Sequence, residues 1–187
     1  AEAGAIFRSD TGELALDRRK GLFTAAAPCA VVAAGFLGEA GEVALGPARI
    51  ECGTAFASIS LAALDGLPLE RSRRVLVTAV ARSENTGQAF LDEKSGGAAP
   101  AGVDADTGMT FFHGQNLQLA RAGAAPVLAE PVKARIGLRS AHSLRAYALN
   151  EKGEKREDLP LDESAGAVRV ATDRAKSPWI LLEAQGK

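Results

Sequence analysis

The sequence predicts an all-β protein, an antiparallel two-sheet β-sandwich with one long loop around residues 92–123. Three observations carry this prediction. Apolar residues recur at every second position in several short segments, which is typical of strands that bury one face. Turn residues separate these segments at short intervals, as in sandwiches and barrels. No amphipathic helix of twelve residues is found, although alanine, a good helix former, is abundant.

Predicted strands follow one another along the whole chain. Period-two alternation is found at 48–52, 57–61, 132–139 and 168–170. Turn residues delimit further predicted strands at 6–9, 13–16, 22–24 and 144–149. Two further runs, 75–80 and 179–182, are apolar on both faces, which indicates central strands or strands of a covered sheet. The predicted core consists of Ile50, Ile59, Leu61, Val75, Val77, Val80, Val132, Ile136, Leu138, Leu144, Val168, Val170, Ile180 and Leu182.

Turn chemistry separates the predicted strands. Glycine and asparagine supply the positive φ angles that tight turns need. Such turns are predicted at Asp10-Thr11-Gly12, Lys20-Gly21, Asp65-Gly66, Asn85-Thr86-Gly87, Asn150–Gly153 and Ser164–Gly166. The glycines at 35, 38 and 41 lack the spacing of a phosphate-binding loop and predict a turn between two strands. No sequence linker divides the chain, so we expect a single domain over 1–187.

Composition excludes several classes of function. The net charge is −1 and the pI about 6.2, so the basic footprint of a nucleic-acid-binding protein is missing. No apolar run approaches the roughly 18–20 residues that span a bilayer, and the start of the chain has no signal-peptide pattern. The chain has only two His and two Cys, and these show no zinc-ligand spacing. We expect no cofactor.

Cys29 and Cys52 are the only cysteines and are 23 positions apart in apolar segments. Two buried thiols are favoured, because buried cysteine packs as a small hydrophobe. One disulfide between neighbouring strands stays open as the alternative.

Few side chains are candidates for a binding site. Phe111, Phe112 and His113 lie in the long loop, where exposed aromatic rings can stack on sugars, and Trp179 is a further aromatic candidate. The alternative is that these aromatic residues anchor the loop and fill the core. Asp104 and Asp106 stand beside a glycine in a pattern that calcium accepts, although the remaining ligands of an EF-hand are missing.

Four segments together resemble a known family. They are Ser9–Leu14 with Gly21–Thr24, Phe56–Leu69, Pro126–Val132 and Pro178–Glu183. They resemble the C-terminal β-sandwich attached to many bacterial (β/α)8-barrel glycoside hydrolases, with Leu16 in place of the tryptophan that usually precedes Asp17.

The resemblance implies an accessory role. The family's catalytic carboxylates lie on barrel strands, and this chain is too short to contain a barrel of about 250 residues. No catalytic residue is therefore carried over, and this chain by itself is not expected to be catalytic, although the parent protein would be a glycoside hydrolase. We expect a bacterial domain that stabilises the catalytic barrel of the same protein and shapes its carbohydrate cleft through the long loop, in polysaccharide degradation.

Two alternatives are an independent carbohydrate-binding module and a structural or self-associating sandwich. The resemblance favours a periplasmic or secreted location over a cytoplasmic one. It implies a barrel partner and a carbohydrate, with neither nucleic acid nor membrane.

Overall fold

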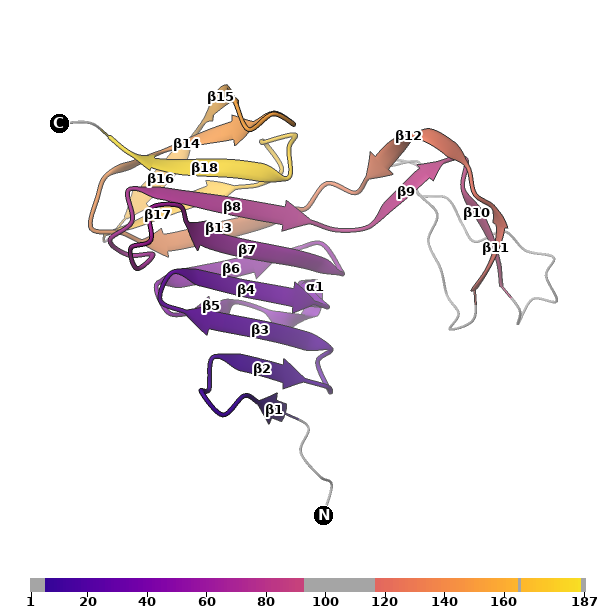
Figure 1. The fold of residues 1–187 in the computed structure, drawn as a ribbon, viewed down its shortest axis with the longest axis horizontal. Helices are drawn as coiled ribbons and strands as arrows, with labels where there is room; N and C mark the ends of the chain where they lie inside the picture. The colour runs from indigo at the N-terminus through magenta and orange to yellow at the C-terminus, as the bar shows by residue number, and fades with distance from the viewer. Residues whose placement is uncertain (1–5, 93–116, 165, 186–187) are drawn as a thin grey trace, which may run out of the picture. The chain divides into compact units, whose positions relative to one another are not determined.

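The computed structural model describes residues 6–92, 117–164 and 166–185. The chain divides into two compact units, one formed by residues 1–81 with 131–187 and one by residues 82–130. Within the described residues nearly all regular structure is β-strand, and the strand pairs are antiparallel (Figure 1). The predicted all-β antiparallel fold class is confirmed.

The first unit contains two sheets. The nine-stranded sheet has, in spatial order, β1 (Ile6–Arg8), β2 (Leu14–Asp17), β3 (Leu22–Ala27), β4 (Ala30–Gly35), β7 (Ala57–Ala63), β8 (Arg74–Val80), β18 (Trp179–Ala184), β14 (Leu144–Leu149) and β15 (Lys155–Leu159). The five-stranded sheet has β16 (Leu161–Ser164), β17 (Ala167–Ala171), β13 (Ala134–Arg139), β6 (Ala48–Cys52) and β5 (Val43–Leu45).

The two sheets bury one hydrophobic core between them. Ile59 and Leu61 of β7 and Ile50 and Ile136 of the other sheet are all almost completely buried and belong to one cluster. Because successive side chains on a strand point to opposite faces, the predicted alternation places these residues on the inner faces. The architecture is the predicted two-sheet sandwich.

One predicted core residue is wrong. Val80, at the end of β8, is 42% exposed, whereas Val75 and Val77 are fully buried. The cause is strand parity, because Val75, Val77 and Ala79 share the inner face and Val80 must then point outward. The other outward residues of the run 75–80, Leu76 and Thr78, are only half-buried. The outer face of this run is therefore not covered by another element of this unit.

Gly35 and Gly41 flank a short helix, α1 (Leu37–Ala40), which contains Gly38 and which the sequence did not predict. Gly35 has φ 132°, and a Cβ atom there would lie 1.9 Å from the carbonyl oxygen of Gly21. Only glycine permits this close approach of β3 and β4. Gly41 follows α1 with φ 70° and turns the chain into β5.

The second unit is built from two strand pairs. β9 (Ser83–Thr86) pairs with β12 (Ala124–Ala129), and β10 (Ala89–Asp92) pairs with β11 (Leu117–Arg121). Arg82 and Glu130 form an ion pair of 2.9 Å where the two chain segments of this unit meet. The long loop predicted around 92–123 therefore includes a strand, and its centre, residues 93–116, lies outside the described residues.

The two cysteines are free and half-buried. Cys29 lies in the turn between β3 and β4, and Cys52 ends β6. Burial raises the pKa of the Cys52 thiol, against the opposing effect of hydrogen bonds from Thr54. Of the two alternatives that the sequence left open, the structure has thiols.

Candidate functional site

The outer faces of the two sheets differ sharply in charge. On the five-stranded sheet the outward positions carry Arg49 and Glu51 on β6, Arg135 on β13 and Arg169 on β17, all exposed. Such charged side chains are typical of a sheet face that contacts water. The nine-stranded sheet is different, because from β1 to β8 its outward positions along three rows carry no charge.

These outward positions form three cross-strand rows, which we call the apolar face. Its members are Phe7, Leu16, Phe23, Ala34, Ser58 and Val80 in the first row; Leu14, Ala25, Val32, Ser60, Thr78 and Trp179 in the second; and Ala27, Ala30, Ala62, Leu76, Leu181 and Tyr147 in the third. Registered neighbours lie on the same side of a sheet, so the rows form one continuous surface.

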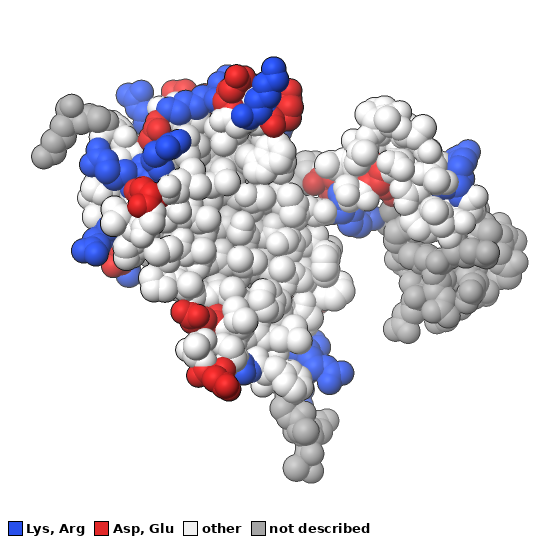
Figure 2. Space-filling view, in the orientation of Figure 1, with Lys and Arg blue, Asp and Glu red and all other residues white. Residues whose placement is uncertain are grey.

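The apolar face is large, and all of its members except the buried Leu181 are at least partly accessible. Figure 2 shows it as a broad uncharged area between charged groups at the margins of the sheet. Strand spacing and rise give about 32 Å² for each outward position, hence roughly 550–600 Å² for the three rows. This is at the upper end of the largest apolar patches on monomeric proteins, which often mark interaction sites. Leu14, Leu16 and Phe23 are each more than a third exposed.

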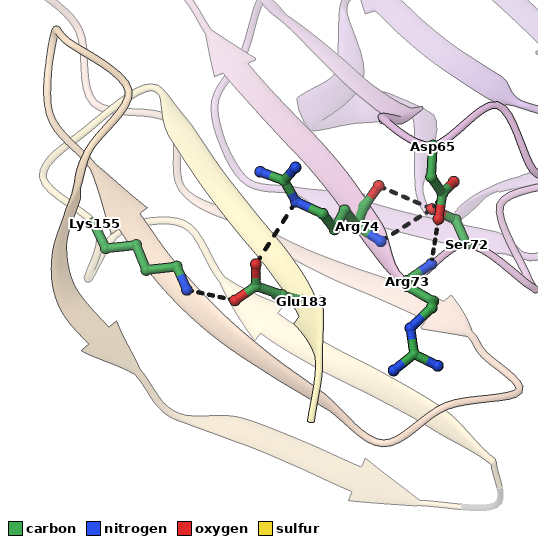
Figure 3. Close-up of polar contacts among 6 residues, drawn as sticks. All are labelled: Asp65, Ser72, Arg73, Arg74, Lys155 and Glu183. Atoms are coloured by element: carbon green, nitrogen blue, oxygen red, sulfur yellow. Dashed lines mark hydrogen bonds and ion pairs between the residues drawn. The ribbon is translucent and has the colours of Figure 1, made fainter. Parts of the chain in front are cut away.

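Charged and polar residues border the apolar face at the ends of β8, β18 and β15, with β14 between the last two (Figure 3). Glu183 of β18 forms an ion pair with Arg74 at 3.6 Å and another with Lys155. The Lys155 ammonium lies 4.1 Å from the centre of the Tyr147 ring. An apolar centre with a polar border is the usual anatomy of a protein interface.

A hydrogen-bonded turn fixes the β7–β8 connection beside this border (Figure 3). The Asp65 carboxylate accepts the Arg73 N–H at 2.8 Å and bonds the Ser72 hydroxyl at 2.8 Å. Ser72 is fully buried, and its oxygen also accepts the Arg74 N–H at 3.2 Å. The Arg73 N–H is the main cause of the lowered pKa of Asp65. Desolvation opposes it as the second-largest effect, and hydrogen bonds from Ser72 and Leu67 lower the pKa further. The network holds β7 and β8 in the register that aligns the rows.

A second feature lies over the five-stranded sheet, on its outer face. It is a hollow of about 700 Å³ above Gly137, in the middle of β13. Charged residues of both signs line it, namely Glu42, Arg49, Glu51, Lys133, Arg135, Asp162, Arg169, Asp173 and Arg174. The lining of the hollow is thus charged, in contrast to the apolar face on the other sheet.

Only one sequence-predicted binding residue lies within the described residues. Trp179 begins β18, is 36% exposed and belongs to the second row of the apolar face, opposite Thr78. Phe111, Phe112 and His113 lie outside the described residues, and so do Asp104 and Asp106. Among the residues that the structure describes, no group of three or more His, Cys, Asp and Glu side chains could hold a metal ion.

The described part of the chain contains no helix of sufficient length and apolarity to cross a membrane. Comparison with known proteins finds no matching family model, no matching curated protein and no matching solved structure.

Sequence reasoning missed both surface features. The signal for the apolar face was present in the strand runs 75–80 and 179–182, which are apolar at outward positions as well. Ala25, Ala30, Ala34 and the serines of β7 gave no such signal, because small residues occur on either face of a sheet.

Proposed function

We propose that this chain is the non-catalytic β-sandwich domain of a glycoside hydrolase, and that its apolar face packs against the (β/α)8 catalytic domain of the same protein. One observation carries the proposal: three registered rows without charge on one outer face, on a molecule whose other outer face is charged. Contact with a partner explains the difference in charge, since a sheet face that contacts water usually carries polar side chains.

The area supports a covalently linked partner over a second copy. Contact across the apolar face would bury roughly 550–600 Å² on each side, or about 1,100–1,200 Å² in total. This lies within the range of 600–1,500 Å² for interfaces between domains of one chain, and below the average for separate proteins. A linker keeps the partner at an effective concentration near millimolar, so a modest interface suffices.

The segments that carry the family resemblance also contribute to this face. Leu14 and Phe23 come from the first segment, Ser9–Leu14 with Gly21–Thr24. Ser58 and Ser60 come from Phe56–Leu69, and Trp179 comes from Pro178–Glu183. Part of the apolar face thus lies in the segments that carry the resemblance, and this overlap favours a family-specific contact.

The test is to mix the purified chain, at concentrations up to about the millimolar level that a linker would provide, with the separately produced (β/α)8 hydrolase domain of the proposed parent protein. We expect a higher melting temperature or glycosidase rate of the catalytic domain. Ser60→Asp places a carboxylate in the centre of the apolar face, and burying an unpaired charge costs several kcal/mol, so binding should weaken at least 100-fold. Ala44→Asp adds the same charge to the five-stranded sheet and should bind like wild type.

Two results would count against the proposal. The first is an unchanged melting temperature and rate of the catalytic domain in the presence of the chain. The second is equal weakening by both aspartate variants, which would place the contact elsewhere or reflect a general charge effect.

A second candidate is an independent carbohydrate-binding module, which the exposure of Trp179 beside the Thr78 hydroxyl favours. An exposed indole stacks on a sugar ring while a neighbouring hydroxyl hydrogen-bonds to it. Electrophoresis through gels that contain soluble polysaccharides tests this function. Retardation that Trp179→Ala abolishes would support it, and free migration in every gel would exclude it.

A further inference from the structure

The hollow over the five-stranded sheet has an unusual floor. Gly137 occupies the middle of β13 and is buried, directly opposite Arg49 on one neighbouring strand and Arg169 on the other. The pairing runs without interruption through Gly137 on both sides, so the glycine does not mark a bulge. Glycine in the interior of a strand weakens it, and it often marks a bulge, a tight bend, or a place where a ligand or another backbone approaches closely.

Neither backbone nor packing requires this glycine. Its φ lies outside the left-handed region, and a Cβ atom there would be 3.5 Å from the Arg49 Cβ and 3.7 Å from the Arg169 Cγ, which are ordinary contact distances. Alanine would therefore fit and would stabilise the strand. What the glycine provides is space in the middle of the hollow.

The lining of the hollow indicates the kind of molecule that fits. Its volume of about 700 Å³ is within the range of 300–1,000 Å³ for small-molecule sites. Arg135 and Arg169 make no ion pair or hydrogen bond through their guanidinium groups among the described residues, whereas Arg49 bonds two carbonyl oxygens and lies 3.7 Å from Glu42. Free guanidinium groups bind carboxylate, phosphate or sulfate groups in bidentate fashion.

Carboxylates stand among these arginines. Asp162 of β16 is the registered neighbour of Arg169, and Glu51 of β6 is that of Arg135. These carboxylates would repel a molecule that carries only anionic groups. Their oxygens accept hydrogen bonds readily from hydroxyl groups. A ligand for this hollow must therefore carry an anionic group for the arginines and hydroxyl groups for the acids.

We propose that the hollow above Gly137 is a binding site for an acidic sugar, that is, a sugar unit with a carboxylate, phosphate or sulfate group. Arg169 and Arg135 hold the anionic group, Asp162 and Glu51 accept from ring hydroxyls, and the bare backbone at Gly137 lets the ring approach the sheet. This site is independent of the apolar face and of the proposed contact with a catalytic domain.

The test is isothermal titration or NMR titration of the full chain with glucuronate, glucose 6-phosphate and glucose 6-sulfate. Glucose and acetate are the controls, since one lacks the anion and the other the hydroxyls. We expect at least one acidic sugar to bind at least tenfold more tightly than both controls. The acidic sugar that binds identifies the source of the anionic group, and equal binding of acetate would reduce the site to a nonspecific anion contact and overturn the proposal.

Matched variants locate the site. Gly137→Ala should weaken binding at least tenfold while the melting temperature stays the same or rises, a combination that loss of fold cannot produce. Arg169→Ala should also weaken binding at least tenfold. Ala44→Val, in the same cross-strand row but outside the hollow, and Arg139→Ala, on the same strand, should bind like wild type. No saturable binding of any acidic sugar, or undiminished binding by Gly137→Ala, would overturn the proposal.

Discussion

Truncating Leu61 in the centre of β7 tests the packing of the sandwich quantitatively. Leu61 is fully buried and pairs with Val31 on β4 and Val77 on β8. Leu61→Ala removes three carbon atoms, worth about 2.4 kcal/mol of transfer free energy at about 0.8 kcal/mol each. The cavity adds to this loss, and fully buried leucines measured in this way cost about 3–5 kcal/mol. For a chain of this size we expect the melting temperature to fall by roughly 10 °C.

The assay is urea unfolding followed by the fluorescence of Trp179, the only tryptophan. Trp179 lies on β18, which pairs with β8, so it reports on the same sheet. Ser60→Ala is the control, since its outward, half-buried side chain should change the free energy of unfolding by no more than about 0.5 kcal/mol. A loss below about 1 kcal/mol for Leu61→Ala, or equal losses for both variants, would refute the assigned inner and outer faces of β7.

Three further predictions concern single polar groups. The buried Thr172 hydroxyl accepts the Ala134 N–H at 2.9 Å and donates to the Val132 carbonyl oxygen. In urea titrations, Thr172→Val should therefore lower the free energy of unfolding by about 1–3 kcal/mol. No loss would show that these backbone groups find other partners. Because the pKa of Asp65 is lowered in the folded state, its contribution to stability is present above the unfolded pKa of about 3.9 and is lost as pH falls through the lower folded pKa. Urea midpoints are measured between pH 6 and pH 2, about two pH values on each side of that pKa. They should fall more steeply with decreasing pH for wild type than for Asp65→Asn. Parallel curves for the two proteins would contradict this. Since burial raises the pKa of Cys52, alkylation by iodoacetamide at pH 8, near the roughly 8.5 of a free thiol, should be slower at Cys52 than in the unfolded chain, whereas equal rates would contradict the burial.

The strands were predictable because burial on one face imposes a period of two on the sequence. β13 is an example, since Ala134, Ile136 and Leu138 are buried while Arg135 and Arg139 are exposed, as the alternation predicts. Val80 shows the limit of the method, because a run that is apolar at every position does not reveal which half of its residues points inward. The order of strands within the sheets depends on long-range pairing, which local patterns do not contain.

The two candidate sites could not be predicted from the sequence for a related reason. The apolar face exists only through register, since Ser60 becomes the neighbour of Val32 and Thr78 when β4, β7 and β8 pair. The hollow likewise depends on the placement of Gly137 between two arginines that are far from it in the chain. Of the aromatic candidates, Trp179 is accessible, and its use in binding stays a prediction.

The measurement that tests the central claim most directly is hydroxyl-radical footprinting of the chain with and without the (β/α)8 hydrolase domain. Leu16, Phe23 and Trp179 are each more than a third exposed and lie on the apolar face, so they report on its coverage. Pro160 and Arg135 report on the outer face of the five-stranded sheet. We predict that oxidation of the first group falls at least threefold in the mixture while oxidation of the second group is unchanged. Unchanged oxidation of Phe23 and Trp179 in a mixture that forms a complex would contradict the claim that the apolar face is the interface.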